Sequence, residues 1–292
     1  MMPKFDAKAV WTRWLSTKQP QVTLFMCVPT VYARLIAYYD ESLASTYASK
    51  VAACCQKFRL QICGSAALPS TIKRKWEKLS GGVVLLERYG MTEIGMALSN
   101  GYEPEKRLDG SVGWPLPGVT VRLITTDDAN RDVIAVDNEP GEIQVKGDNV
   151  FLEYWRKPEA TKKEFTEDGF FKTGDIAVVN HSQSGAFYIQ GRASVDIIKS
   201  GGYKISALDV ERELLSLPMI DEAAVVGLDD EEWGQRVAAV VTLADKNGEL
   251  GLKDLRNKLR KSLASYKIPT VLKIVDEIPR NKMGKCMLFA ST

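Results

Sequence analysis

Apolar runs that alternate with helix-forming segments dominate the first third of the sequence, and they constrain the fold most strongly. Residues 22–28 (VTLFMCV), 58–63 (FRLQIC) and 83–90 (VVLLERYG) have the apolar, β-branched composition of buried strands, and helical patterns separate them. This alternation predicts an α/β fold in which helices cover both faces of a mostly parallel sheet. In such sheets, ligands bind beyond the carboxyl ends of the strands.

The pattern changes twice after this region. Short strands with glycine and proline turns follow, and then two amphipathic helices occur among further strands, which predicts a small α+β domain. We therefore expect a partial N-terminal domain, a hinge and a C-terminal domain. The predicted divisions are 1–109 for the α/β part and 110–190 for a β-rich subdomain of the same N-terminal domain (1–190), 191–195 for the hinge, and 196–292 for the C-terminal domain.

The stretch 191–206, GRASVDIIKSGGYKIS, joins the last two regions. Its paired glycines, Gly201 and Gly202, allow a positive φ and a close approach of the backbone to a ligand. Taken alone, the pattern is more typical of a strand that ends in a glycine turn. Its neighbouring motifs favour a ligand-binding loop.

Composition excludes several classes of protein. The 292 residues include 39 basic and 37 acidic side chains, so no broad basic field would attract nucleic acid or a lipid surface. The five cysteines show no CxxC spacing, which argues against a zinc site or a disulfide framework. No apolar run is long enough to span a bilayer. The single histidine, His181, lies in a polar turn, where a surface role is more common than catalysis.

Four motifs occur in a particular order. They are ERYGMTE at 87–93, FFKTGD at 170–175, the glycine stretch at 191–206, and PRNKMGK at 279–285. This order resembles the adenylate-forming superfamily of acyl-CoA synthetases, luciferases and peptide-synthetase adenylation domains. The resemblance implies an enzyme that activates a carboxylic acid with ATP and Mg²⁺ and then passes the acyl group to coenzyme A. Its expected partners are these small molecules.

The resemblance implies roles for the residues of the first half-reaction. A hydroxyl can bond a phosphate oxygen, a carboxylate can hold Mg²⁺, and an aromatic ring can stack on adenine. We therefore expect Thr92 to bind phosphate, Glu93 to bind Mg²⁺ and Tyr89 to contact adenine; an ordinary turn is the alternative. The remaining nucleotide-binding residues implied by the family are Gly64, Ser65 and Ala66 around adenine, Gly90 and Met91 beside Tyr89, Asp175 at the ribose, and Arg192 at the ribose or phosphate. For the small residues 64–66, tight helix packing is the alternative.

The two-step reaction implies further roles. Lys285 is expected to stabilise charge at the attacking carboxylate and the α-phosphate, with Lys282 as the nearby competitor and a solvated tail lysine as the alternative. In the family, the C-terminal domain then rotates, which gives Ser194 the role of hinge. The residues expected to bind coenzyme A after this rotation are Lys199, Ser200, Gly201, Gly202 and Tyr203.

The acid substrate is predicted from Arg34. The local sequences VPTVYARLI, CGSAALP and GRASVDIIKSGGYKIS resemble those of malonyl-CoA synthetases. A guanidinium pairs well with the second carboxylate of malonate and would be poorly tolerated in a fatty-acid tunnel. The alternatives are a surface arginine on an amphipathic helix, a short-chain or medium-chain acyl-CoA synthetase, and a noncatalytic chain that binds nucleotide or coenzyme A.

One expected motif is missing. The family carries a Ser/Thr/Gly-rich phosphate loop that ends in a lysine, and the sequence contains neither this loop nor a GxxxxGK[ST] replacement. We expect an N-terminally truncated member of the family with little or no ligase activity by itself. The resemblance also implies a mitochondrial matrix location, with the cytoplasm as the alternative; the oligomeric state is not predicted.

Overall fold

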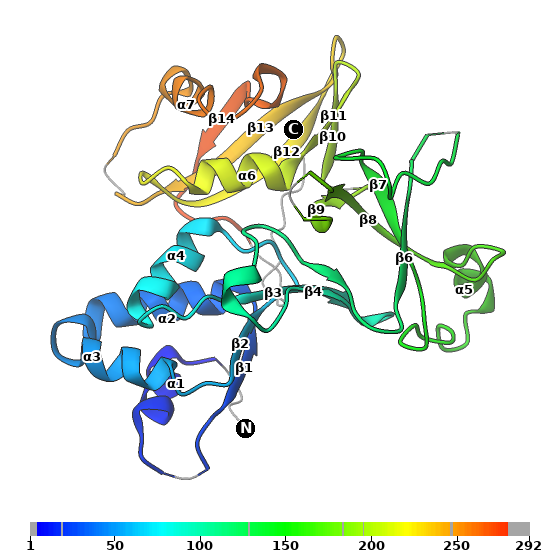
Figure 1. The fold of residues 1–292 in the computed structure, drawn as a ribbon. Helices are drawn as coiled ribbons and strands as arrows, with labels where there is room; N and C mark the ends of the chain where they lie inside the picture. Colours follow the sequence, from blue (N-terminus) through cyan, green and yellow to red (C-terminus); the bar gives the residue numbers. More distant parts are fainter. Residues whose placement is uncertain are drawn as a thin grey trace. The chain divides into compact units, whose positions relative to one another are not determined.

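Two compact units make up the described part of the chain in a computed structural model (Figure 1). Each unit combines several separate stretches of sequence. The structure describes residues 5–18, 20–127, 129–182, 184–194, 196–245 and 248–279. Unit 1 contains the described residues of 5–121, 145–171 and 180–188; unit 2 contains those of 122–144, 172–179 and 189–279.

A five-stranded sheet runs through unit 1 in the order β1-β2-β3-β4-β5. The pairings β1–β2 and β2–β3 are parallel, which confirms the predicted α/β arrangement. The pairings β3–β4 and β4–β5 are antiparallel, so the prediction of a mostly parallel sheet is wrong for the second half. The reason is a tight turn after β3 that sends the chain straight back. The strands are β1 Leu24–Cys27, β2 Leu60–Cys63, β3 Leu86–Met91, β4 Gly95–Ser99 and β5 Trp114–Pro115.

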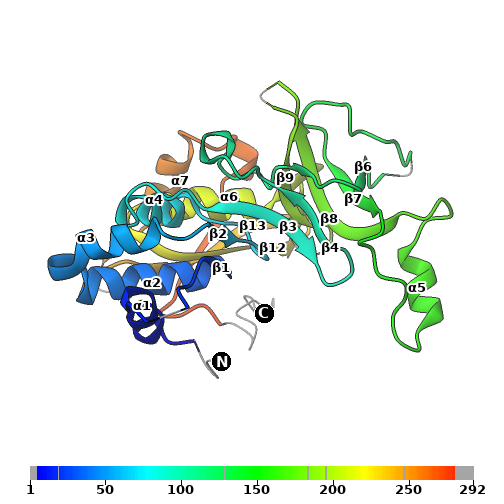
Figure 2. The same cartoon turned by 60° about the horizontal axis from the view of Figure 1, so that its bottom comes forward.

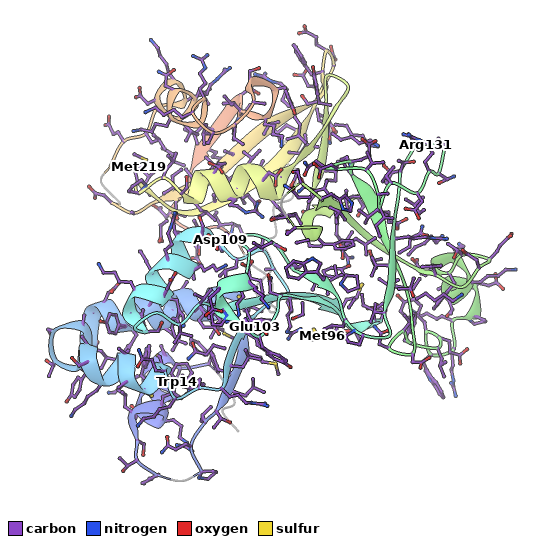
Figure 3. The ribbon with its side chains drawn as sticks, viewed as in Figure 1. Trp14, Met96, Glu103, Asp109, Arg131 and Met219 are labelled. Atoms are coloured by element: carbon purple, nitrogen blue, oxygen red, sulfur yellow. The ribbon has the colours of Figure 1, made fainter. Side chains whose placement is uncertain are left out.

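Four helices of unit 1 share one hydrophobic core with the strands. Trp11 and Trp76 are almost fully buried, and Trp14 makes edge-to-face contacts in the same core (Figure 3). The opposite face of the sheet exposes Leu24 and Met26. The prediction that helices cover both faces is therefore wrong for the described residues, because α1 to α4 gather on one side (Figures 1 and 2). The helices are α1 Ala7–Leu15, α2 Pro29–Ser42, α3 Ala44–Cys55 and α4 Ser70–Leu79.

A four-stranded sheet, in the order β6-β7-β8-β9, contributes residues to both units. Its strands confirm the strand pattern predicted between residues 110 and 190. Strand β8 begins earlier than expected, so most of the FFKTGD motif lies inside the strand. The elements are β6 Thr120–Ile124, β7 Gly141–Lys146, helix α5 Pro158–Glu164, β8 Phe171–Asn180 and β9 Ala186–Arg192; a 3₁₀ helix, Pro104–Lys106, precedes them.

The third sheet belongs to unit 2 and has the order β11-β10-β13-β12, with β14 beside β13. Aliphatic side chains such as Ile205, Val210 and Leu255 form its core against two helices. The Ser206 hydroxyl accepts a hydrogen bond from Asp209 N and begins α6 directly after β11. The elements are β10 Ile197–Ser200, β11 Tyr203–Ser206, α6 Ala207–Leu215, β12 Ile220–Asp230, β13 Gly234–Leu243, α7 Leu252–Leu259, the 3₁₀ helix Ser265–Lys267 and β14 Val271–Ile274.

Among the described residues, no helix has both the length and the apolar character needed to cross a bilayer.

Candidate functional site

The adenine-pocket residues follow directly after β2. Gly64 is buried, and a Cβ built on it would lie 3.1 Å from Arg88 O of the neighbouring strand. Ser65 has a φ of +67°, which is unusual for a residue with a side chain, and both Ser65 and Ala66 are exposed. The parallel register pairs Cys63 with Glu87, so this turn lies beside β3. The structure therefore brings the 64–66 segment next to the strand that carries the YGMTE motif.

The YGMTE motif forms one arm and the turn of a hairpin. Tyr89, Gly90 and Met91 lie within β3, and only Thr92 and Glu93 lie in the turn that leads to β4. The expectation that this motif follows the end of a strand is wrong for Tyr89, Gly90 and Met91, because β3 continues to Met91, one residue beyond the predicted run 83–90. Tyr89 is 9% exposed, whereas Thr92 is exposed. A Cβ on Gly90 would lie 2.0 Å from Gly95 O, so only glycine allows the two strands to approach this closely.

Glu93 is held at the turn by residues that are distant in sequence. Its Oε1 accepts a hydrogen bond of 3.0 Å from the Tyr154 hydroxyl, and its carbonyl accepts one of 2.7 Å from Phe151 N. A carboxylate is a suitable ligand for Mg²⁺, which proteins often bind through one or two carboxylates together with substrate phosphates. The Glu93 carboxylate offers the oxygen ligand that such an ion prefers. Within the described residues, no group of three or more His, Cys, Asp or Glu could hold a metal ion.

Asp175 and Arg192 form an ion pair in unit 2. Arg192 Nε lies 3.1 Å from Asp175 Oδ1, and the carboxylate is mostly buried while the guanidinium is half-exposed. Gly174 has a φ of +72° inside β8, and its N–H donates to Glu142 Oε1 at 3.1 Å. Its carbonyl accepts from Ala193 N at 2.9 Å. These bonds fix the position of the two predicted ribose residues relative to each other.

The paired glycines form the turn of the β10–β11 hairpin. Gly201 and Gly202 have φ values of +54° and +84°, and the register pairs Ser200 with Tyr203. The predicted positive φ is confirmed at both glycines. Lys199 and Tyr203 are exposed on the two strands, and Ser194 is exposed before them. This arrangement brings all five predicted coenzyme A residues to one end of unit 2.

Sequence reasoning missed two aromatic residues beside this turn. Trp233 accepts a hydrogen bond from Gly201 N at its carbonyl, and its side chain is 51% exposed. Tyr266 stacks on Tyr203 with ring centroids 4.2 Å apart and an interplanar angle of 13°. Neither residue belongs to a sequence motif that we used. An exposed aromatic surface is suited to stacking against a flat base.

Arg34 lies on α2 and is exposed. No hydrogen bond or ion pair reaches its guanidinium from the residues that the structure describes, so the group is available to a ligand carboxylate. Lys282 and Lys285 lie outside the described residues. Their roles stay predictions.

The thiols near the adenine turn are unsuited to nucleophilic chemistry. Burial raises the pKa of Cys27, at the end of β1, to about 12, and that of Cys55 also to about 12. Burial likewise raises the pKa of Cys63. Because the thiolate is the reactive form, these side chains are protonated and unreactive at neutral pH.

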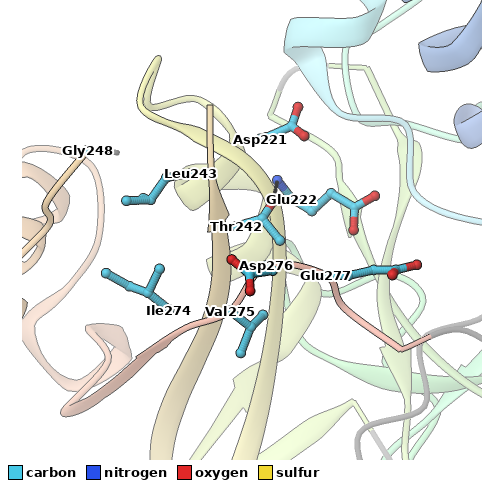
Figure 4. Close-up of a pocket in the computed structure, with 9 residues that line it drawn as sticks. All are labelled: Asp221, Glu222, Thr242, Leu243, Gly248, Ile274, Val275, Asp276 and Glu277. Carbon is cyan, nitrogen blue, oxygen red and sulfur yellow. Dashed lines mark hydrogen bonds between the residues drawn. The ribbon is translucent and has the colours of Figure 1, made fainter. Parts of the chain in front are cut away.

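A separate cavity of about 280 Å³ lies at the other end of unit 2 (Figure 4). It lies where β12 begins and β13 ends, whereas the glycine hairpin meets β13 at its first residue, Gly234. Its lining includes four carboxylates, from Asp221, Glu222, Asp276 and Glu277. Such a lining repels anions, and none of the predicted site residues contributes to it.

Comparison with known proteins identifies the family. The pattern described as AMP-binding enzyme matches residues 1–155, and the AMP-binding enzyme C-terminal domain matches residues 209–285. This chain belongs to the AMP-binding enzyme family. The predicted adenylate-forming resemblance is thereby confirmed.

Individual relatives give a more specific comparison than the family does. The chain is 47% identical over 303 residues to the bovine protein named malonate–CoA ligase ACSF3, mitochondrial, with 98% of this chain and 51% of the relative covered. It is 41% identical over 300 residues to the malonate–CoA ligase of Arabidopsis thaliana, with 97% and 47% covered. The chain thus spans about half the length of these relatives.

Solved structures agree on the fold. The ATP-bound MatB structure from Rhodopseudomonas palustris is similar with a TM-score of 0.82 and 35% sequence identity, covering 98% of this chain and 52% of that one. The mixed α/β fold predicted from the sequence is therefore that of an adenylate-forming enzyme.

Proposed function

We propose that this chain carries the nucleotide-binding and thiol-binding residues of an ATP-dependent acid–thiol ligase that converts malonate to malonyl-CoA. One observation carries the proposal: the 47% identity to a malonate–CoA ligase extends over 98% of this chain, and therefore through both hairpins and the Asp175–Arg192 pair. In the first step, a malonate oxygen attacks the α-phosphorus of ATP and pyrophosphate leaves. In the second step, the sulfur of coenzyme A attacks the acyl carbon and AMP leaves.

The described residues are assigned to ATP as follows. The 64–66 turn, which is exposed at Ser65 and Ala66, and Tyr89 contact the adenine. The Thr92 hydroxyl bonds a phosphate oxygen, and the Glu93 carboxylate would hold Mg²⁺. Asp175, whose carboxylate Arg192 holds at 3.1 Å, is assigned to the ribose hydroxyls, since a carboxylate accepts hydrogen bonds from hydroxyl groups. Bound Mg²⁺ would neutralise phosphate charge.

The whole proposal is tested by malonate-dependent formation of AMP. The 292-residue chain is assayed by itself and with the N-terminal half of the bovine relative added as a second polypeptide. We expect AMP formation only when malonate is present, with acetate and medium-chain acids inactive. Absence of malonate-dependent AMP in both samples would refute the ligase assignment and favour a chain that only binds nucleotide or coenzyme A.

Arg34 is proposed to select malonate. Its guanidinium is exposed and has no described partner, so it can pair with the carboxylate that does not react. Replacement Arg34→Leu should lower kcat/KM for malonate by about tenfold or more, since a charge-assisted pair is worth about 1.5–3 kcal/mol. Arg34→Lys keeps the charge but loses the bidentate geometry, so its kcat/KM for malonate should lie between those of the wild type and Arg34→Leu. Activity on fatty acids with unchanged malonate kinetics would favour a short-chain or medium-chain synthetase.

The β10–β11 hairpin is proposed to bind coenzyme A, with Lys199, Ser200, Gly201, Gly202 and Tyr203 along its path. The exposed ring of Trp233 and the stacked pair Tyr203–Tyr266 support this assignment, because they offer flat surfaces to the adenine of coenzyme A. Ser194 is proposed as the hinge that lets one domain serve both steps. Bulky replacements at Gly202 should then impair thioester formation and spare pyrophosphate exchange.

Lys285 is proposed as the catalytic lysine of the first step. Lys285→Ala should lower pyrophosphate exchange far more than thioester formation from supplied malonyl-adenylate, and Lys282→Ala serves as the matched control. Equal losses in both half-reactions would contradict this division of roles.

A mitochondrial location is proposed because the bovine relative carries that word in its name, whereas the plant relative does not. The matrix is the specific compartment proposed, and the cytoplasm is the alternative. Fractionation of cells that express the tagged native protein distinguishes the two.

A further inference from the structure

We infer that Tyr154 is a positioning residue for Glu93: its phenol holds in place the carboxylate that the proposed function assigns to Mg²⁺. The inference rests on that proposed function. It is drawn from a side-chain contact between two residues that lie 61 positions apart in the sequence.

The contact belongs to a three-point attachment within unit 1. The Tyr154 hydroxyl donates to Glu93 Oε1 at 3.0 Å, and Phe151 N donates to Glu93 O at 2.7 Å. Asn149 Nδ2 donates to Ile94 O at 2.6 Å. Two of these bonds fix the backbone of the turn, and only the tyrosine bond reaches the functional carboxylate. The segment 149–154 thus holds both the backbone of the turn and the side chain of Glu93.

The ring of Tyr154 packs against a cluster of phenylalanine rings. It lies 4.7 Å from the ring of Phe151, which in turn contacts Phe165 and Phe171 with centroid distances of 5.7 and 5.3 Å. The backbone N–H of Tyr154 donates to Thr161 Oγ1, within α5, at 2.9 Å. The ring contact and the backbone hydrogen bond together give the Tyr154 hydroxyl a defined position.

The chemistry of the contact suits a metal ligand. A phenol O–H donates one hydrogen bond, and a carboxylate oxygen accepts it without losing its charge. This bond engages one carboxylate oxygen, Oε1, and the proposed role assigns the other to the cation. Glutamate otherwise rotates about several bonds, and ordering it on binding would cost side-chain entropy. A group that orients a metal ligand typically contributes about 10- to 100-fold to metal affinity.

The test is a double-mutant cycle that uses Mn²⁺ with ATP as the probe. Binding of Mn²⁺ with ATP to the 292-residue chain is followed by the electron paramagnetic resonance signal of Mn²⁺, measured against a sample of Mn²⁺ and ATP without protein because ATP itself binds the ion. This readout does not depend on turnover. The variants are Tyr154→Phe, Glu93→Gln and the double mutant. Tyr102→Phe, a change of the same type at an exposed tyrosine, is the matched control.

We expect Tyr154→Phe to weaken ATP-dependent Mn²⁺ binding by about tenfold in the wild-type background and to have little further effect in the Glu93→Gln background. Tyr102→Phe should leave binding unchanged. The thermal unfolding temperature of Tyr154→Phe should stay near that of the wild type, because the variant keeps the ring and both backbone hydrogen bonds of the turn.

Three results would overturn the inference. One is unchanged Mn²⁺ affinity in Tyr154→Phe, and another is an equal loss in both backgrounds, which would show that Tyr154 does not act through Glu93. The third is a large fall in the unfolding temperature, which would make the tyrosine structural. If the wild-type chain itself shows no ATP-dependent Mn²⁺ binding, the proposed nucleotide site fails, and the inference fails with it; that outcome is distinguished by the wild-type sample alone.

Discussion

Two hairpins of this chain carry predicted ligand residues, and different interactions hold them. The β3–β4 hairpin has its turn at Thr92 and Glu93, and the segment 149–154 fixes that turn through three hydrogen bonds. The β10–β11 hairpin turns at Gly201 and Gly202, whose positive φ values define the turn locally. The first turn is therefore held by a distant segment, whereas the second combines a locally set glycine conformation with a distant hydrogen bond, from Gly201 N to Trp233 O.

Glycine serves a different purpose in each hairpin. Gly90 is required because a Cβ would collide with Gly95 O at 2.0 Å. Gly202 is required because its φ is +84°, while the space around its Cβ position is open. Steric exclusion by backbone cannot be relieved by a small shift, whereas a strained φ costs a limited amount of energy. The predictions below test this difference.

The largest expected effect follows from Gly90→Ala. The added methyl group must separate β3 from β4, and we expect a loss of about 3 kcal/mol or more in the free energy of unfolding, at the upper end of the range for overpacking. Urea unfolding followed by tryptophan fluorescence measures it, since Trp11, Trp14 and Trp76 all lie in the core of unit 1. A loss below about 1 kcal/mol would show that the hairpin is not held this tightly.

Alkaline pH should destabilise unit 1 more than unit 2. Burial raises the pKa of Cys27 and Cys55 to about 12, so the folded state keeps protons that the unfolded state loses above about pH 9. Stability from these thiols is complete below that pH and falls as the pH rises toward 12, by about 1.4 kcal/mol for each thiol at pH 10.

The measurement for this second prediction compares hydrogen exchange at pH 7.5 and pH 10, corrected for the intrinsic rate. Protection of β1 to β3 should fall, and protection of β10–β11 should change less, because every cysteine that the structure describes lies in unit 1. The double variant Cys27→Ala, Cys55→Ala is the control and should flatten the pH dependence. Equal losses in both units would contradict the assignment to these thiols.

A smaller effect is expected at the glycine turn. Gly202→Ala should cost about 1–2 kcal/mol, because alanine is strained at a φ of +84°. Gly202→Asn should cost less, since asparagine tolerates this region better. Gly201→Ala should exceed Gly202→Ala, because its Cβ would lie 2.7 Å from a ring carbon of Trp233. Thermal unfolding temperatures rank the three variants by stability. A larger loss for Gly202→Ala than for Gly201→Ala would show that the Trp233 ring does not restrict the Gly201 position.

The smallest effect should come from Asn149→Ala. It removes the hydrogen bond to Ile94 O and should cost about 1 kcal/mol, the usual net value of one such bond. Hydrogen exchange should become faster in residues 92–95 and stay unchanged in residues 197–206. Faster exchange in both hairpins would mean that the two turns are not held independently.

Local patterns predicted a large part of the fold and some of the site. The three apolar runs become β1, β2 and β3, and the amphipathic segments of the C-terminal region become α6 and α7. The positive φ of Gly201 and Gly202 was also predictable, because two adjacent glycines between strand-forming residues favour such a turn. In each case the controlling interaction lies within a few residues along the chain.

The tertiary structure decided what depends on residues far apart in sequence. Sequence reasoning could not foresee the Tyr154–Glu93 hydrogen bond, the contact of Trp233 with Gly201, or the placement of α1 to α4 on one face of the sheet. Sequence reasoning also missed the antiparallel pairing of β4 with β3. A glycine at position 90 permits close approach of another backbone, but its identity does not say which backbone lies there. Local propensity fixes which residues form a strand, but the partner of a strand or a carboxylate is fixed only when distant segments pack together.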